Sequence, residues 1–461
     1  MILSRAGRGR DEEKSWVDKM LNRIAFSSRA MFVVLSVVIS FLLLFLVFMI
    51  DDLDTNPFHH IDDAFNGIQS LQTTMYTDFN APFYNESVVD YRSRLHQMFI
   101  SGRVRPGTIF VSLASFRDTK CHSTLRSIFD KASQPERIFV GVVDQTKLDE
   151  TSDDIPCESL LTQPELSRVR LVRIDSNRAR GPTHARYIAS KLWNGEQYFT
   201  QVDAHSWFAP NWDSLLIANL VALPKPSFSV ITHYPPGSEG ELLGTDVTWI
   251  CEAKHHEQAP PGLFVQSQDV CRDQNKSPGL ALNSNGKRTT CLSPFMGGGF
   301  FAADSGFLID APLDKYLPYI FHGEEVLIAA RLWTSGWNLY TPAVNLVAHN
   351  YSPRVKNVHV ETPTWGPIGK QSEARARYLL NATIPNDVDF DRSEINDLGM
   401  GNVRRLNDYM EFAGLENLAE GVFVSRCRQR WQNGHWVDQD QGQSEMDSAA
   451  RLPLFLDHNS R

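Results

Sequence analysis

The sequence has little cysteine and no excess of basic residues. Its 461 residues include six cysteines, and no two of them are separated by only two residues. The paired-cysteine spacing of many zinc sites is therefore missing, and a zinc site is not expected. Lys and Arg number 45 against 54 Asp and Glu, which gives a net charge of −9. Because nucleic-acid-binding domains carry clustered positive charge, a nucleic acid is not expected as the main partner.

Charge and proline are both missing from residues 31–50, an unbroken apolar run. Its 20 residues, at a helical rise of about 1.5 Å, match the ~30 Å hydrocarbon core of a bilayer, so the run predicts a transmembrane helix. Seven Lys and Arg precede it, whereas Asp51, Asp52 and Asp54 follow it. The positive-inside rule then places residues 1–30 in the cytoplasm and the following chain in a lumen, as in a single-pass type II protein. A cleaved signal peptide is the alternative, although no small-residue cleavage site follows closely.

The cysteines agree with an oxidising compartment. All six lie beyond residue 50, so disulfides are allowed there, but the sequence alone leaves their pairing open. Four Asn-x-Ser/Thr tripeptides, which are potential N-glycosylation sites, also follow the apolar run. They begin at Asn85, Asn275, Asn350 and Asn381.

Strands and helices alternate in the middle of the chain. Each predicted strand is short, apolar and rich in β-branched or aromatic residues, and each predicted helix has an apolar face. This spacing indicates an α/β fold with a mixed, mainly parallel central sheet that is flanked by helices and joined by right-handed crossovers. The expected strands are 107–116, 137–145, 168–175, 196–203, 228–232 and 338–348, and the expected helices include one that opens at Pro182, 212–223 and 326–333.

Changes of composition divide the chain into regions. Residues 51–105 are polar without clear periodicity and predict a stem. Residues 235–290 are rich in Pro, Gly, Ser and Gln, and they predict a loop-rich insertion with little regular structure. The expected regions are a tail at 1–30, an anchor at 31–50, a stem at 51–105, the main α/β domain at 106–352, a helical extension at 353–430 and a weakly ordered tail at 431–461.

Asp203 and His205 come directly at the end of the predicted strand 196–203. In open α/β sheets, ligands collect beyond the carboxyl ends of the strands. An Asp and a His two residues apart, in a turn at such an end, can aim their ligand atoms at one divalent ion, and that ion could neutralise a diphosphate. The alternative is a capping Asp followed by a surface His.

Glycines and acids mark two further places. Gly297–Gly299 are three glycines in a row, which let the backbone approach a ligand closely or simply form a tight turn. Glu324 and Glu325 stand at the start of a predicted helix that is apolar nearly all round. Two carboxylates at that place are costly unless they meet a ligand, a cation such as Arg331 or the N-terminal dipole of the helix.

Several spaced motifs resemble those of retaining GT-A glycosyltransferases. The closer likeness is to the protist-type polypeptide α-N-acetylglucosaminyltransferases, and the mucin-type polypeptide GalNAc-transferases share a related pattern. The resemblance covers about residues 107–415. Its motifs are Ser-Leu-Ala-Ser-Phe-Arg-Asp (112–118), Val-Gly-Val-Val-Asp-Gln (140–145), Ala-Arg-Gly-Pro-x-x-Ala-Arg (179–186), Asp-Ala-His (203–205), Gly-Glu-Glu…Arg-Leu-Trp-Thr-Ser-Gly (323–336) and Leu-Gly-x-Gly-x-x-Arg-x-Leu (398–406).

The resemblance implies a GT-A-type nucleotide-sugar fold and a metal site formed by Asp203, His205 and His349. One carboxylate and two imidazoles, together with two phosphate oxygens of a donor, suit Mn²⁺ or another divalent cation. The implied task of the ion is to stabilise the departing UDP as a Lewis acid. His349 follows the last predicted strand, and it could otherwise be a strand-end histidine without a ligand.

A donor site is also implied by the resemblance. Asp144 resembles the residue that meets the uridine, and Arg117 and Arg186 are either donor contacts or salt bridges within the fold. Glu324 and Glu325 resemble the catalytic-site acids that hold the sugar. The implied donor-binding residues are Ser112, Arg117, Asp144, Arg186, Asp203 and Gly298.

The implied activity is transfer of GlcNAc from UDP-GlcNAc to a hydroxyl of Ser, Thr or hydroxyproline in secretory-pathway polypeptides, with retention of the anomeric configuration. A leaving phosphate oxygen is the implied base, so no side-chain base is expected. The predicted anchor then places the enzyme in the Golgi membrane, with the catalytic domain at 106–352 in the lumen. Two alternatives stay open: a transferase for another UDP-sugar or for a glycan or lipid acceptor, and a non-catalytic lectin-like relative.

Overall fold

The computed structural model describes residues 86–148, 152–255, 263–266, 269–271, 290–352, 356–362, 365–384 and 388–415. The predicted cytoplasmic tail, the predicted membrane span, most of the predicted stem and the C-terminal tail lie outside these residues. Within the described residues, no helix is both long enough and apolar enough to cross a membrane.

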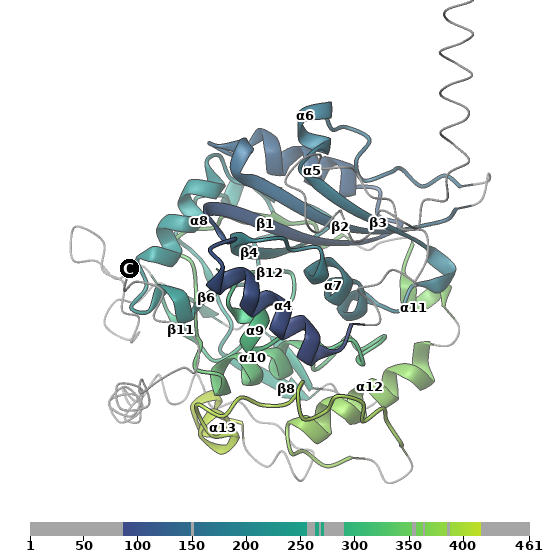
Figure 1. The fold of residues 1–461 in the computed structure, drawn as a ribbon, viewed down its shortest axis with the longest axis vertical. Helices are drawn as coiled ribbons and strands as arrows, with labels where there is room; N and C mark the ends of the chain where they lie inside the picture. The colour runs from purple at the N-terminus through teal and green to yellow at the C-terminus, as the bar shows by residue number, and fades with distance from the viewer. Residues whose placement is uncertain are drawn as a thin grey trace, which may run out of the picture. The chain divides into compact units, whose positions relative to one another are not determined.

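An eight-stranded sheet forms the centre of the fold, with the strand order β11-β13-β6-β12-β4-β1-β2-β3 (Figure 1). Strand β1 pairs in parallel with both β2 and β4, β2 with β3, and β6 with β13. Strand β12 runs antiparallel between β4 and β6, so the sheet is mixed and mainly parallel, as predicted. The strands are β1 Arg105–Phe116, β2 Ile138–Thr146, β3 Val169–Asp175, β4 Glu196–Asp203, β6 Ser229–Thr232, β11 Leu292–Ser293, β12 Phe300–Asp304 and β13 Asn338–Tyr340.

The start of helix α7 follows from the residues at its N-terminus. Helix α7 starts at Pro182, whose missing N–H costs nothing in the first turn, as predicted. Gly181 before it has a φ of 87°, which a residue with a side chain rarely adopts. The helices are α4 Val88–Ile100, α5 Cys121–Asp130, α6 Gln163–Leu166, α7 Pro182–Lys191, α8 Trp212–Val221, α9 Phe307–Asp310, α10 Glu324–Thr334, α11 Val358–Glu361, α12 Trp365–Leu379 and α13 Leu406–Ala413.

The sheet separates two apolar cores. Alternation along β1 sends Phe110 to one face and Ile109 and Val111 to the other, as the two-residue period of a strand requires. Helices α5 and α8 cover the second face, whereas α4, α7, α9, α10, α12 and α13 lie on the first, as Figure 1 shows above and below the sheet. Both faces are therefore buried, which explains why the central strands are apolar at nearly every position.

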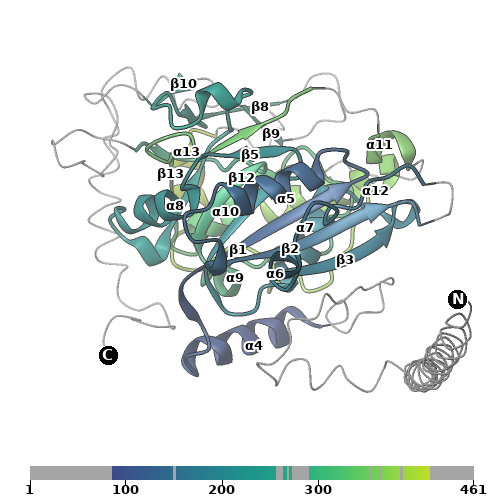
Figure 2. The ribbon, with the colours of Figure 1, turned by 90° about the horizontal axis from the view of Figure 1, so that it is seen from above.

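Helix α4 extends the folded domain beyond the predicted boundary at residue 106. Tyr91 and Leu95 are buried in the core with the sheet, at 2% and 0% exposure. Arg92 donates from Nε to the carbonyl of Ile309 at 2.8 Å. Seen from above, α4 runs along one side of the domain (Figure 2). Residues 86–105 thus pack on the α/β fold, although their polar composition predicted a stem.

The predicted closing strand 338–348 is two strands in the structure. β13 ends at Tyr340, and β14 Val347–His349 pairs with β5 Ser206–Phe208 in a separate antiparallel sheet. Pro342 lies between the two strands and has no N–H for a sheet ladder, which accounts for the break. The pairing of β14 with β5 sets His349 opposite Ser206, the neighbour of His205.

The predicted loop-rich insertion at 235–290 contains short strands. They form two antiparallel pairs, β7 with β10 and β8 with β9. Their bounds are β7 Thr248–Trp249, β8 Glu252–His255, β9 Leu263–Gln266 and β10 Asp269–Val270. A disulfide joins Cys271 in this region to Cys291 just before β11, and a second joins Cys121 to Cys157. These two disulfides account for four of the six cysteines whose pairing the sequence left open.

Candidate functional site

A cavity of 570 Å³ lies at the carboxyl ends of the central strands, where the sequence predicted a ligand site. Ser115 of β1, Gln145 of β2 and Asp203 of β4 line it from the sheet. The start of α10 and the segment after β14 complete the wall. Its volume falls within the range of about 300–1,000 Å³ that is usual for small-molecule sites. The polar side chains in the lining are Ser115, Gln145, Arg186, Asp203, His205, Tyr234, His322, Glu324, Glu325, His349, Asn350, Tyr351, Ser352, Lys356, Asn357 and His359.

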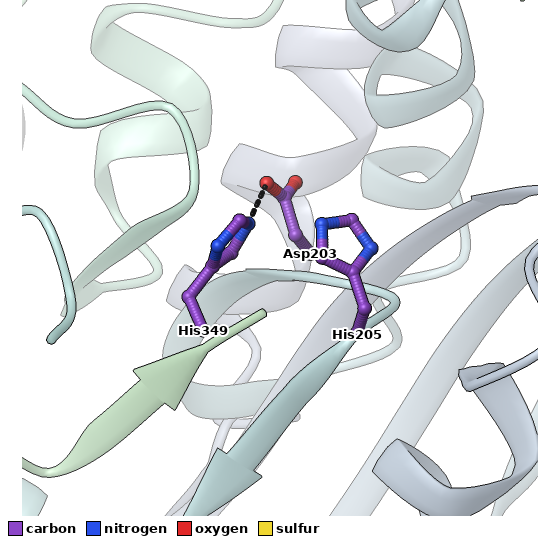
Figure 3. A group of neighbouring side chains, drawn as sticks. All are labelled: Asp203, His205 and His349. Atoms are coloured by element: carbon purple, nitrogen blue, oxygen red, sulfur yellow. Dashed lines mark hydrogen bonds and ion pairs between the residues drawn. The ribbon is translucent and has the colours of Figure 1, made fainter. Parts of the chain in front are cut away.

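Asp203, His205 and His349 converge in this cavity (Figure 3). One ligand atom from each lies within 4.8 Å of the others, a grouping that could hold a metal ion. The Nε2 atom of His349 lies 3.2 Å from Oδ2 of Asp203. Residues 203 and 349 are far apart in the sequence, and the pairing of β5 with β14 brings them together. The structure thus brings together the three residues that the motif resemblance implied as metal ligands.

Asp118 orients the first histidine. Its Oδ2 atom lies 2.8 Å from Nδ1 of His205, so the other ring nitrogen, Nε2, is the one available to an ion. Carboxylate partners of this kind fix the ring orientation of metal-binding histidines. The sequence reasoning did not single out Asp118 as a site residue, although it closes the motif at 112–118. The donor set of one carboxylate oxygen and two imidazoles fits a divalent transition-metal ion such as Mn²⁺.

Arg186 connects Asp203 with Glu324. Its guanidinium donates to Oδ1 of Asp203 at 2.8 Å and to both carboxylate oxygens of Glu324 at 2.9 and 3.0 Å. Burial alone would raise the pKa of the Asp203 carboxyl, but the Arg186 charge and the two neighbouring imidazoles lower it far below its usual value. Asp203 is therefore ionised, and its Oδ2 atom, which Arg186 does not contact, faces the imidazoles.

Glu325 has a different environment from its neighbour Glu324. It accepts from the N–H of Gly298 at 2.7 Å and from the hydroxyl of Tyr234 at 2.6 Å. Burial raises the pKa of the Glu325 carboxyl to about 7 despite these two hydrogen bonds. Arg331 pairs with neither acid, because it donates instead to the carbonyls of Pro312 and Gly399. Both acids are thus held by hydrogen bonds from residues that line the cavity.

Gly298 and Gly299 make room for these side chains. A Cβ atom on Gly298 would lie 3.0 Å from a guanidinium nitrogen of Arg186 and 3.4 Å from Oε1 of Glu325. A Cβ atom on Gly299 would lie 3.2 Å from Oδ2 of Asp203. The glycines at 298 and 299 therefore allow the backbone of this segment to approach the site's own acids and arginine.

Two of the implied donor residues, Ser112 and Asp144, do not line the cavity. Both are fully buried in the sheet. Burial raises the pKa of the Asp144 carboxyl to about 6, against the opposing effects of Arg173 and the N–H of Cys157. Oδ1 of Asp144 and Oγ of Ser115, which lies opposite it in the strand register, have no hydrogen-bond partner within the described part of the chain.

Arg117, another implied donor contact, does not itself line the cavity and is engaged in ion pairs. It donates from Nε to Asp154 at 2.9 Å and from another guanidinium nitrogen to Glu361 of α11. Lys356 joins the same group by donating to Asp153 and Asp154. The structure therefore shows the alternative that the sequence left open for Arg117, a salt bridge within the fold.

Tyr234 and Gln145 are site residues that the sequence reasoning missed. Gln145 directly follows Asp144 in β2, and its side chain donates to the carbonyl of Ser115 at 2.9 Å. Tyr234 comes two residues after the end of β6. Both could have been found by applying the strand-end rule to β2 and β6 as it was applied to β4.

Comparisons with known proteins identify the family of this chain. The family model described as Glycosyltransferase (GlcNAc) matches residues 108–166 and 162–419. A comparison with curated proteins gave no match. Among solved structures, GalNAc-T7 with UDP, GalNAc and Mn²⁺ is 16% identical with a TM-score of 0.41, and the match covers 72% of this chain and 57% of that chain. S. aureus TarS 1–349 is 12% identical with a TM-score of 0.36, over 75% of this chain and 81% of that chain. The family match spans more than half of the sequence, and the chain belongs to the glycosyltransferase (GlcNAc) family.

Proposed function

We propose that this glycosyltransferase moves GlcNAc from UDP-GlcNAc to a hydroxyl of Ser, Thr or hydroxyproline in polypeptides, with retention of configuration and in dependence on Mn²⁺. The observation that carries the proposal is the convergence of Asp203, His205 and His349 in the cavity at the strand ends. A transferase that releases a nucleoside diphosphate needs positive charge at that place, because negative charge develops on the leaving oxygen. The family match and the motif resemblance support UDP-GlcNAc as the donor.

Asp203, His205 and His349 would hold the metal ion. When bound, Mn²⁺ supplies Lewis-acid stabilisation of the leaving diphosphate. The chain's own contribution is to orient the ligands. Asp118 fixes the ring of His205, and Arg186 takes one oxygen of Asp203 and leaves the other for the site.

Glu324 and Glu325 stand where the sugar of the donor would lie. Arg186 fixes Glu324 from one side, and Gly298 and Tyr234 fix Glu325 from the other. Carboxylate oxygens that are held in place can accept hydrogen bonds from sugar hydroxyls without losing conformational freedom on binding. These contacts would orient the anomeric carbon, and no side-chain base is required of them.

The strand ends of β1 and β2 offer a place for the nucleoside. Oγ of Ser115 and Oδ1 of Asp144 are buried polar atoms without a partner in the described residues, and Ser115 and Gln145 line the cavity whereas Asp144 does not. A buried polar atom without a partner costs about 1–3 kcal/mol. A uracil ring has donor and acceptor groups at its edge, and the side-chain amide of Gln145 in the cavity lining is the candidate to meet them.

Exposed aromatic side chains at the mouth of the cavity favour a polypeptide acceptor. Phe321 and Tyr351 are lining residues that are 59% and 57% exposed. His359 extends this surface, with its ring 5.6 Å from Phe321 and 4.9 Å from Trp365. Aromatic rings of this kind are favoured in contacts with peptides, which bring apolar side chains beside the acceptor hydroxyl.

The proposed location is the Golgi membrane, with residues 31–50 as a type II anchor and the catalytic domain in the lumen. The charge asymmetry around the apolar run supports this orientation. Protease protection on microsomes tests it. Digestion of a C-terminal tag without detergent would reverse the orientation.

The function is tested with the purified full-length chain, a panel of UDP-sugars, Mn²⁺ and a Thr-rich peptide library. Transfer of GlcNAc to peptides, measured by mass spectrometry, is the expected result. Hydrolysis or transfer of a donor sugar without any glycosylated peptide would favour the glycan or lipid acceptor. Absence of UDP-sugar binding in calorimetry would favour the non-catalytic relative, and preference for another UDP-sugar would replace the proposed donor.

A further inference from the structure

A groove of 440 Å³ lies at the C-terminal end of helix α12. It shares no lining residue with the candidate site, and within the described residues no charged side chain belongs to its lining. One lining residue, Asn381, begins the tripeptide Asn-Ala-Thr at 381–383, which has the sequence of an N-glycosylation site. An attachment point for a sugar therefore lies in the groove itself.

The end of helix α12 leaves the side chain of Asn381 exposed. The N–H of Asn381 donates to the carbonyl of Tyr378 at 3.1 Å, and the N–H of Ala382 donates to the carbonyl of Arg377 at 2.8 Å. These two bonds form a Schellman motif, which satisfies carbonyls of the last turn through the backbone alone. Asn381 has a φ of 54°, a left-handed conformation that asparagine adopts more readily than most residues. The helix end therefore does not need the side-chain amide as a cap.

The third residue of the tripeptide, Thr383, is exposed as well. An N-glycosylation site requires the hydroxyl of this residue. The carbonyl oxygen of Thr383 accepts from a guanidinium nitrogen of Arg377 at 3.3 Å. Because that contact uses the backbone, a substitution at position 383 can remove the hydroxyl without removing the contact.

The other tripeptides of this kind are placed differently. Those that begin at Asn85 and Asn275 have their asparagines outside the described residues. Asn350 lines the candidate site, and its Oδ1 atom accepts from the N–H of Ser352 at 2.9 Å. A glycan on Asn350 would lie where the donor is proposed to bind. A glycan on Asn381 would leave the candidate site open.

The groove at Asn381 offers the surfaces that a sugar ring contacts. Tyr378 is 49% exposed, and its ring is steadied by the ring of Phe390, whose centroid lies 5.4 Å away. Met400 is half-buried and adds apolar surface, and the exposed amide of Asn396 can donate to and accept from sugar hydroxyls. A sugar attached to Asn381 is already at the groove, so these contacts are intramolecular and form without the cost of association.

We propose that Asn381 carries an N-linked glycan and that the first GlcNAc of this glycan packs on Tyr378 in the groove. The attachment forms a bond between Nδ2 of Asn381 and C1 of the GlcNAc. The bond between C1 and the diphosphate of a lipid-linked oligosaccharide breaks, and the amide loses one proton to the medium. The host cell supplies that donor in the lumen. The proposal therefore rests on the proposed lumenal location of the catalytic domain, and it does not depend on the sugar that the enzyme itself transfers.

The first test is mass spectrometry of the full-length chain from cells with a glycosylating secretory pathway. Release of N-glycans by peptide N-glycosidase in H₂¹⁸O labels each modified asparagine, and Asn381 is expected to carry the label. Thr383→Ala should abolish the label at Asn381, whereas Thr383→Ser should keep it because serine retains the hydroxyl. Both variants keep Asn381 and the carbonyl that Arg377 contacts.

An unlabelled Asn381 in the wild-type chain overturns the proposal, and two observations show at which step it fails. Label at Asn85 or Asn275 in the same sample would leave the lumenal location standing and remove only this site. Digestion of a C-terminal tag on microsomes without detergent would instead remove the location, and the site with it.

The second test measures the packing of the sugar in the groove. Chains from cells that make only high-mannose glycans are trimmed with endoglycosidase H, which leaves one GlcNAc on each modified asparagine. The trimmed Thr383→Ser chain should melt about 1–3 °C above the equally treated Thr383→Ala chain. In a Tyr378→Ala background this difference should disappear, because the ring that the sugar contacts is gone.

Val221→Ala is the matched control background. Val221 is 53% exposed, ends helix α8 and does not line the groove, so the difference between the two Thr383 variants should persist there. Exposed Tyr378 leaves no core cavity when it is shortened, so the comparison does not depend on a misfolded variant. Equal melting of the trimmed Thr383→Ser and Thr383→Ala chains overturns the packing in the groove, and so does a difference that is unchanged by Tyr378→Ala.

Discussion

Two ion clusters lie near the carboxyl ends of the central strands, and they differ in what their side chains are free to do. Each centres on an arginine that meets more than one carboxylate. The Arg186 cluster consists of Arg186, Asp203 and Glu324, and it adjoins His205 and His349. The Arg117 cluster consists of Arg117, Asp153, Asp154, Lys356 and Glu361.

The Arg117 cluster is closed by its own ion pairs. Lys356 contacts Asp153 and Asp154 at 2.7 Å, and Arg117 contacts Asp154 and Glu361. The ion pairs of this cluster connect the end of β1 with the segment at 152–154 and with α11. In the Arg186 cluster, by contrast, Oδ2 of Asp203 faces two imidazoles across the cavity. An arginine that pairs with two acids can therefore either hold chain segments together or belong to a ligand site. The two cases differ in whether metal-binding atoms of neighbouring side chains still face a common point in the cavity.

The largest effect on transfer is expected from the metal ligands. Asp203→Asn and His349→Ala should each lower kcat by about 10²-fold or more, by analogy with loss of one charge-stabilising group in a transition state. The charge of the departing diphosphate develops in the transition state, so the loss should appear mainly in kcat. Transfer rates measured against Mn²⁺ concentration test this, with circular dichroism melting as the control for folding.

Asp389→Asn serves as the matched control for these variants. Asp389 is an exposed acid that pairs with Arg392 at the surface and does not line the cavity, so the transfer rate of the variant should not change. Full activity of the wild-type chain in EDTA would contradict the metal site. An unchanged Mn²⁺ dependence in a folded His349→Ala variant would remove His349 from it.

The next effect concerns Glu324, the acid that Arg186 holds beside the metal ligands. Glu324→Gln should lower the transfer rate by roughly 10-fold, which corresponds to about 1.4 kcal/mol in the transition state. Affinity for UDP should change much less, because the residue is interpreted as a sugar contact. Initial rates and calorimetry with UDP measure the two quantities. Equal losses in both would reassign Glu324 to fold stability.

Glu325 should have a smaller effect on transfer and a larger one on pH dependence. Its folded pKa is raised to about 7 from a usual value of 4.5. For an acid with a raised pKa, the contribution to stability is full below about 4.5 and is lost as the pH rises through about 7. The wild-type chain should therefore lose up to about 1.4 kcal/mol per pH unit across this window relative to Glu325→Gln. Urea unfolding from pH 5 to 8 measures the difference, and parallel profiles would contradict it.

The sequence predicts much of this arrangement because strand ends and helix starts have local signals. The strand at 196–203 and the start of α7 at Pro182 agree with the structure to the residue. The break in the strand predicted at 338–348 also had a signal, Pro342, because proline cannot donate to a sheet ladder. The grouping of Asp203, His205 and His349 agrees with the site that the motif and the strand-end position predicted.

Other features depend on tertiary packing and could not be inferred. Asp144 and Gln145 are adjacent in β2, and only the second lines the cavity, because successive side chains point to opposite faces of a strand. Helix α4 docks through a few buried residues such as Leu95, which a short polar segment does not reveal. Arg117 forms an ion pair with Glu361, which is 244 residues away in the sequence, and the sequence alone does not show this contact.

The smallest effect on transfer is expected in the Arg117 cluster, where stability should change instead. Arg117→Ala should reduce the free energy of unfolding by about 1–3 kcal/mol, because it leaves buried charged acceptors with one partner fewer. The loss stays in this range because Lys356 continues to pair with Asp154. Transfer by the folded variant should stay within a few-fold of wild type, since Arg117 does not line the cavity.

Two comparisons sharpen this last prediction. Arg392→Ala breaks an exposed pair with Asp389 and should change stability by less than about 0.5 kcal/mol.

Burial raises the pKa of Asp154, but Arg117 and Lys356 lower it overall to about 2, below its usual value of 3.8. The stability from this acid is therefore present above about 3.8 and is lost as the pH falls through about 2. Urea unfolding at pH 7 and at pH 3 measures this effect. The free energy of unfolding should fall less between pH 7 and pH 3 in Arg117→Ala than in the wild-type chain. If the variant keeps its stability but loses transfer, Arg117 belongs with the donor contacts, and the distinction between the two clusters fails.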